Sequence, residues 1–198
     1  MEAAAAAHCG EKSMRSAARL SGSLRAAFNP DGKPAAVTVV VVSCGDGRVA
    51  ESLVTGLIDA GVRVRRVLLS DPRLFLPRAK PQDAPPPLEA SLAPRVEKLR
   101  RATGVANIIA RREPKSGAAW LAFAREAIGS SNGLRGDDDD DEEHGTTGVV
   151  LAAGSPLEGP AGLRFARAFE ALAAVPATGK TSPVCCYVPF RPTPPAPD

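Results

Sequence analysis

The distribution of apolar residues predicts alternating strands and helices, and the clearest such unit begins near residue 37. Residues 37–42 are apolar except for one threonine, which is typical of a strand buried on both faces of a parallel sheet. Residues 43–47 predict a turn in which glycines allow positive φ angles and close backbone approach. Residues 49–58 then carry apolar side chains at a helical period, and Gly61 stands where a helix-ending glycine is expected.

The same alternation continues along the chain and defines the expected fold class. Further strands are predicted at 62–69, 105–110, 148–153 and 183–188, and helices at 13–28, 88–103, 116–128 and 163–175. We expect helix 88–103 to begin properly at Pro94, because proline suits the first position of a helix. In helix 163–175, the side chains expected to face inward are Phe165, Ala166, Phe169 and Leu172. The class is α/β, a three-layer Rossmann-like fold with a mainly parallel sheet of five or more strands and strand 37–42 at its centre.

The length and composition favour one domain with short extensions. The chain has 198 residues, which we divide into a flexible N-terminus at 1–12, a domain at 13–190 and a proline-rich tail at 191–198. Aromatic residues make up only 4% of the chain, so the core is expected to consist of Ala, Val and Leu. Seven consecutive acidic residues lie within an insertion at 133–147, and mutual repulsion predicts that it is extended and solvated.

Charge, cysteine and hydropathy patterns limit the partners and the compartment. The net charge is only +3, which permits a polyanionic partner without requiring one. No apolar run approaches the ~20 residues of a membrane span. The cysteines show no CxxC pairing, and Cys44 and Cys185 fall at or in predicted buried strands, so free thiols in a reducing intracellular compartment are expected. Residues 13–28 are rich in Arg, Ser and Ala, as mitochondrial targeting segments are, so the location is mitochondrial or cytoplasmic.

Candidate binding residues follow the predicted strands, where an α/β sheet places its ligand sites. They are Gly45, Asp46 and Gly47 after the first strand, Asp71 after the second and Ser155 after the fourth. Each carboxylate also has a purely structural interpretation: Asp46 as a residue that bonds backbone amides where the helix begins, and Asp71 as a turn residue before Pro72. Trp120 is expected in the core.

Several stretches, taken in order, resemble the YjeF N-terminal domain, whose best-known members are NAD(P)HX epimerases. The stretch KSMRSAARLSGSLRAAF is similar to the family's opening helix, and VVVVSCGDGRVAESLVTGLIDAGVRVRRVLLSDP to its first strand, Asn-Asn-Gly-Gly-Asp-Gly loop, helix and second strand. GVVLAAGSPLEGPAGLRFARAFEALAA resembles the fourth strand with its loop and helix, and SPVCCYVPF the last strand. The resemblance covers residues 13–190 and implies a site for an NAD(P)H-type nucleotide.

The departures from the family pattern concern its chemistry. Ser43 and Cys44 stand where the asparagine-containing part of the phosphate loop should be. Ala152 takes the expected position of the catalytic aspartate in the fourth strand, and alanine cannot exchange a proton. Lys80 is the candidate for the family's lysine after the second strand, although a solvated loop lysine fits equally, and Phe190 replaces the serine of the terminal Pro-Ser-Gly.

These departures lead to three functional hypotheses. The preferred one is a catalytically silent epimerase-like domain that serves as an interaction or assembly module. The resemblance implies a precedent, since mRNA-decapping enhancer proteins carry a similar domain without epimerase chemistry. Its partners would be other proteins, including those of a ribonucleoprotein complex. The second is an active NAD(P)HX epimerase, an isomerase. The third is an S-adenosylmethionine-dependent methyltransferase with residues 45–47 as the cofactor loop and Asp71 on the ribose.

Overall fold

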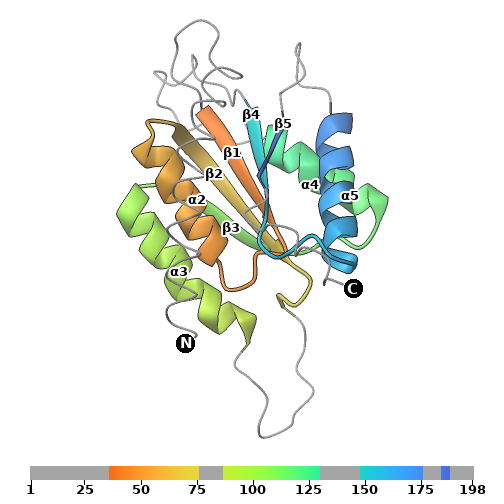
Figure 1. The fold of residues 1–198 in the computed structure, drawn as a ribbon, viewed down its shortest axis with the longest axis horizontal. Helices are drawn as coiled ribbons and strands as arrows, with labels where there is room; N and C mark the ends of the chain where they lie inside the picture. The colour runs from red at the N-terminus through yellow and green to blue at the C-terminus, as the bar shows by residue number, and fades with distance from the viewer. Residues whose placement is uncertain (1–35, 76–86, 130–147, 176–183, 188–198) are drawn as a thin grey trace, which may run out of the picture.

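The computed structural model describes residues 36–75, 87–129, 148–175 and 184–187, and strands alternate with helices through them (Figure 1). The described elements are β1 (Ala36–Val42), α2 (Arg48–Asp59), β2 (Arg63–Asp71), α3 (Leu88–Thr103), β3 (Asn107–Arg112), α4 (Gly117–Gly129), β4 (Gly148–Ala153), α5 (Pro160–Ala174) and β5 (Val184–Tyr187). The bounds of α3 and β4 match the ranges predicted from the sequence, and the other described elements differ from the predicted ranges by a few residues.

The strands form one parallel sheet with β1 at its centre. The order within the described residues is β3-β2-β1-β4-β5, and every neighbouring pair is parallel. All seven residues of β1 are buried, as its continuous apolar character requires for a strand covered on both faces. The predicted α/β class with a parallel sheet, and the central place of β1 between β2 and β4, are therefore confirmed.

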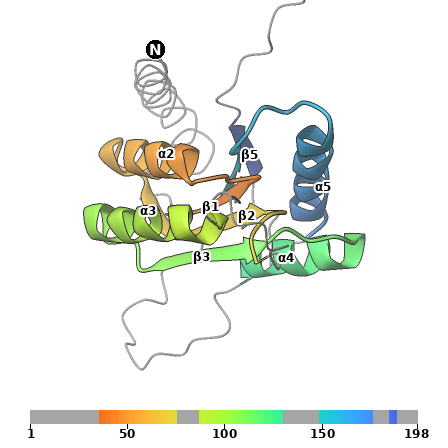
Figure 2. The ribbon, with the colours of Figure 1, turned by 90° about the horizontal axis from the view of Figure 1, so that it is seen from below.

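Helices cover both faces of the sheet (Figure 2). Side chains alternate along β1: Val37, Val39 and Val41 join an apolar cluster with Leu53 of α2 and Leu92 of α3. Val40 and Val42 point the other way, into a cluster with residues of α4 and α5, among them Trp120, Phe123, Phe165 and Leu172. The period of two along the strand thus builds two cores from one apolar run. The prediction that Trp120 belongs to the core is confirmed.

The helix ends show where local signals were sufficient and where they were not. Gly61 adopts φ 77° directly after α2 and donates from its amide to the Ile58 carbonyl at 2.8 Å, as the sequence predicted. The expected start of α3 at Pro94 was wrong, because Pro94 lies inside a helix that already begins at Leu88. Leu92, in the turn before the proline, is buried against α2, and this tertiary packing holds that turn in helical form despite the proline.

Two other expectations about packing were also wrong. Phe169 is 41% exposed and Ala166 is also exposed, whereas the buried side of α5 carries Phe165, Ala168, Ala171 and Leu172. The helical period of the sequence predicts the apolar face of α5 only approximately. Contact with α4 decides which side chains on that face are buried. In addition, β3 lies two residues later than predicted, because its pairing with β2 continues to the Asp71–Arg112 pair. That shift carries Arg112 to the carboxyl edge of the sheet.

Several predicted features lie outside the described residues. They are the N-terminal segment 1–12, the helix at 13–28, Lys80, the acidic insertion 133–147, Phe190 and the tail 191–198. Within the described part of the chain, no helix has the length and apolar character needed to cross a membrane.

The carboxyl ends of β1 and β4 are in close backbone contact, and Gly154 is the residue that permits it. A Cβ atom at Gly154 would lie 2.4 Å from the Ser43 carbonyl oxygen and 2.5 Å from the Cys44 Cα. Because both obstacles are backbone, Gly154→Ala should lower the free energy of unfolding by about 1–3 kcal/mol. Urea denaturation measures this change.

The matched control is Gly117→Ala, where an added methyl group would have no neighbour within 4 Å at the first residue of α4. Its unfolding free energy should be unchanged or slightly higher, since alanine favours helix by roughly 0.5–1 kcal/mol in helix interiors. Equal stability of the Gly154→Ala and wild-type chains would show that the two loops separate at little cost.

Candidate functional site

The loop after β1 is a tight turn in which every second residue from 43 to 47 has a positive φ angle. Ser43 has φ 52°, Gly45 φ 56° and Gly47 φ 84°, so the turn places a non-glycine residue in the left-handed region. The Cys44 amide donates to the Ser70 carbonyl at 2.9 Å, and the Gly47 amide to the Cys44 carbonyl at 3.0 Å. The first bond holds the turn against β2, and the second closes the turn on itself.

Asp71 supports this turn from the end of β2, so the structure brings together two of the predicted site residues, Gly45 and Asp71. The Asp71 carboxylate is 1% exposed and accepts from the Gly45 amide at 3.0 Å. Arg73 donates to it from its amide and Nε, each at 2.9 Å, and from Nη2 at 3.1 Å. Burial alone would raise the pKa of Asp71, but the hydrogen bonds from Arg73 and the Gly45 amide outweigh it and lower that pKa. Both carboxylate oxygens of Asp71 are thus used in hydrogen bonds within the protein.

Asp46 has the structural role that the sequence offered as one interpretation. Its carboxylate accepts from the Arg48 amide at 3.3 Å and pairs with Arg48 Nε at 2.9 Å and Arg95 Nη2 at 3.5 Å. The next residue, Gly47, is covered by α3, since a Cβ there would lie 2.7 Å from Leu92 Cδ1. The start of α2, where an anion would be expected to bind, is consequently covered by α3 and an ion-pair network.

The end of β4 contributes no acid to the candidate site, and Glu158 of the loop that follows is exposed. Ala152 is fully buried in the apolar cluster beneath α2, together with Cys44 and Ala50. Ser155 is partly buried and follows Gly154, whose amide donates to the Val42 carbonyl at 2.8 Å. The two loops therefore meet as predicted, but through backbone and apolar contacts.

Cys44 is a buried free thiol, as predicted. Burial raises the pKa of this thiol to about 12, and the negative charge of Asp71 adds to the rise. A thiol with so high a pKa is almost entirely protonated at neutral pH. The Cys44 side chain therefore contributes to core packing and does not act as a nucleophile.

A second group of residues at the same edge of the sheet was missed from the sequence. A cavity of about 210 Å³ lies between the ends of β2 and β3 and the helices α4 and α5. Its lining residues are Pro72, Arg112, Glu113, Pro114, Lys115, Trp120, Arg164 and Arg167. The signal available in the sequence was the run RREPK at 111–115, which combines an acid with three cations directly after a short apolar run.

Glu113 is the unusual member of this group. It is 5% exposed, and among the described residues neither of its carboxyl oxygens makes a hydrogen bond. Oε2 lies 3.2 Å from Arg164 Nε, an ion pair without hydrogen-bond alignment, and Arg164 Nη1 also donates to Ser43 Oγ at 3.4 Å. Burial raises the pKa of Glu113 to about 7; Arg164 opposes this rise and the Asp71 carboxylate adds to it. The carboxyl group can therefore take up or release a proton near neutral pH.

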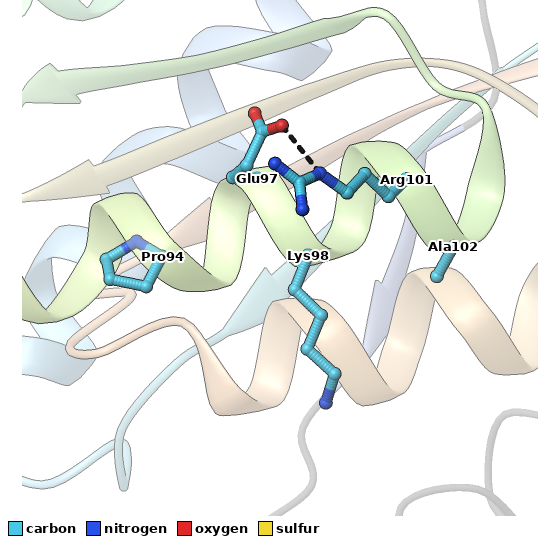
Figure 3. A pocket seen from close by; sticks show the side chains of 5 residues that line it. All are labelled: Pro94, Glu97, Lys98, Arg101 and Ala102. Carbon is cyan, nitrogen blue, oxygen red and sulfur yellow. Dashed lines mark hydrogen bonds and ion pairs between the residues drawn. The ribbon is translucent and has the colours of Figure 1, made fainter.

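A larger hollow of about 530 Å³ lies along α3, but all of its lining residues come from that single helix (Figure 3). Glu97 pairs with Arg101 at 2.9 Å, and Lys98 pairs with Glu51 of α2. Since its charged groups are already paired and no other element contributes, this surface offers no converging chemistry. Among the described residues there is also no group of three or more His, Cys, Asp or Glu side chains that would hold a metal ion.

Comparison of the chain with family models, curated proteins and solved structures gave no significant match.

Proposed function

We propose that this chain is a catalytically silent domain of the YjeF N-terminal type, with a three-layer Rossmann-like fold, that acts as an interaction or assembly module. The observation that carries the proposal is Ala152, which takes the place expected for the catalytic aspartate and is fully buried. Proton transfer next to a nicotinamide requires a titratable group within about 2.6–3.2 Å. The described end of β4, from Leu151 to Ser155, contains no such acid.

The state of the loop after β1 also supports a loss of nucleotide chemistry. Its amides at Cys44, Gly45 and Gly47 donate to the protein itself, and α3 covers Gly47. A phosphate-binding loop needs free amide donors, because the ligand oxygens are held by backbone N–H groups. An NAD(P)H-type nucleotide would therefore have to open this turn before it could bind there.

A role in assembly is supported by exposed apolar side chains of α5 and of the loop before it. Leu157 is 37% exposed, Leu163 55% and Phe169 41%, and all three belong to α5 or the loop before it. Burying large apolar side chains against a partner is favourable by roughly 25 cal/mol per Å² removed from water. The expected partners are other proteins, including those of a ribonucleoprotein complex, in a reducing intracellular compartment.

The two alternatives have less support. An active epimerase would need Lys80, which lies outside the described residues, to work without an acid on β4. A methyltransferase would need Asp71 to accept hydrogen bonds from a ribose, but its carboxylate already accepts four from Gly45 and Arg73.

The test of the silent-domain proposal is an epimerisation assay with the full chain. We expect the R and S hydrates of NADH to interconvert no faster with the protein than in buffer. Loss of a positioned acid–base group costs about 10²–10⁴-fold in rate, which removes any useful acceleration. Equilibration at enzymatic speed by the purified chain would overturn the proposal, and its loss in Lys80→Ala would assign the activity to that lysine.

A further inference from the structure

We propose that the cavity between β3 and α5 binds a small phosphate monoester that carries a hydroxyl group, of about the size of glycerol phosphate. This ligand site is distinct from the nucleotide loop after β1. It goes beyond the assembly role, because it would give the module a small-molecule ligand of its own.

The charge of the cavity is the first argument. Four cations line it, Arg112, Lys115, Arg164 and Arg167, against the single acid Glu113. Arg164 pairs with Glu113, whereas no carboxylate of the described residues forms an ion pair with the other three cations. Within the described residues, three cations around one concave space, the half-buried Arg112 and the exposed Lys115 and Arg167, have no carboxylate partner, which favours a ligand with two negative charges.

Buried polar atoms in this cavity also lack well-aligned hydrogen bonds, although the Glu113 carboxylate has an ion-pair partner in Arg164. Arg112 Nε and both carboxyl oxygens of Glu113 lack a hydrogen-bond partner among the described residues. Such atoms are costly unless water or a ligand satisfies them. A phosphate oxygen can accept from Arg112, and a neighbouring hydroxyl can donate to Glu113, so a hydroxylated phosphate ester meets both needs.

The arrangement of the cations favours phosphate over a single carboxylate. Arg112 ends β3, Lys115 follows it in the loop, and Arg164 and Arg167 lie one turn apart on α5. Residues spaced by three on a helix share a face, so these two guanidinium groups approach the cavity from the same side. Donors from three segments can bond to the several oxygens of one phosphate, which offers more acceptor positions than a carboxylate.

The size of the cavity favours a small ligand. Its volume of about 210 Å³ is below the 300–1,000 Å³ that is typical of sites for drug-sized molecules. Pro72 and Pro114 form rigid walls, and the buried Trp120 is fixed by an edge contact with Phe123 at 5.6 Å between ring centroids. This space therefore suits a three-carbon phosphate better than a dinucleotide.

Glu113 should couple anion binding to a proton. It faces Arg164 of α5, the Asp71 carboxylate of β2 and the Cys44 thiol of the loop after β1, beside the other cations of the cavity. Its pKa of about 7 means that the carboxyl group is neutral below pH 7 and charged above it. The neutral form can donate a hydrogen bond to an anion and does not repel it, so affinity should fall as the pH rises through 7.

Isothermal titration of the full chain with glycerol 3-phosphate tests the site, with glycerol, inorganic phosphate and NADH as comparison ligands. We expect glycerol 3-phosphate to bind tightest and NADH to show no competition with it. The double variant Lys115→Ala/Arg167→Ala should weaken binding at least tenfold. The matched control Arg101→Ala, on the exposed face of α3, should leave binding unchanged. Equal weakening in both variants, or no binding by the wild-type chain, would overturn the proposal.

The proton coupling is tested with sulfate, whose charge is constant over the relevant pH range, followed by NMR shifts of the amides of Arg112, Glu113, Lys115 and residues 164–167. Between pH 6 and 8 the protonated fraction of a group with a pKa near 7 falls about tenfold, so sulfate affinity should fall by a similar factor. Glu113→Gln should bind with little dependence on pH. A wild-type affinity that does not change with pH would show that Glu113 does not take part in binding. Circular dichroism of each variant verifies that it is folded.

Discussion

Val40→Asp is expected to leave no cooperatively folded protein at 25 °C. Val40 is fully buried in the central strand, and it packs into the apolar cluster that α4 and α5 form with the sheet. No described cation lies in that cluster, so the new carboxylate would be buried without a partner. Such a group costs several kcal/mol, which is comparable to the roughly 5–15 kcal/mol that stabilises a typical domain.

Circular dichroism and urea denaturation of the full chain measure this effect. The control is Ala166→Asp, which introduces the same charge at an exposed position of α5 and should change the unfolding free energy by less than about 0.5 kcal/mol. A soluble Val40→Asp protein with the wild-type denaturation midpoint would mean that β1 is not the covered centre of the sheet.

Asp71→Ala is expected to lower the unfolding free energy by about 2–3 kcal/mol at pH 7. The change removes the acceptor of four hydrogen bonds, including the one that holds the Gly45 amide. Bonds to a charged acceptor contribute about 1.5–3 kcal/mol each, but the Arg73 side chain is 64% exposed, so water replaces much of what it loses. The control is Asp59→Ala, at an exposed position near the end of α2, which should be close to neutral.

The pH dependence of stability separates the role of the Asp71 charge from that of its shape. The folded protein lowers the pKa of Asp71 below its ordinary value of 3.8. The stabilisation is therefore complete above that value and is lost as the pH falls through the lower, folded-state pKa. Asp71→Asn should show a shallower loss of stability in acid than the wild type. If the two proteins lost stability equally as the pH falls, the Asp71 charge would contribute nothing to the free energy of unfolding.

The same substitution should also affect the cavity. The Asp71 carboxylate contributes to the raised pKa of Glu113, so removing its charge should lower that pKa. In Asp71→Asn the midpoint of the pH-dependent sulfate binding should accordingly move to lower pH. This shift would link the turn after β1 to the cavity electrostatically.

The sequence alone determined the class, the central strand and most of the helices. The continuous apolar runs of β1 and β4 are local signals, and a strand without a polar face has to be covered on both sides. The end of α2 was also predictable, because the backbone at Gly61 needs a conformation that glycine adopts without strain. These features depend on residues close together in the chain, where composition and spacing carry the information.

The tertiary structure alone decided how the candidate site is used. Asp71 reaches Gly45 across 26 residues, and Arg164 reaches Ser43 across 121, so no local pattern could pair them. The exposure of Phe169 and the start of α3 before Pro94 likewise depend on which neighbouring helix covers each surface. The cavity at Glu113 arises because β3 pairs with β2 two residues further than its apolar run indicates, which places an acid and its neighbouring cations beside α5. Pairing register and helix docking are contacts between distant segments, and their free energies depend on the assembled core.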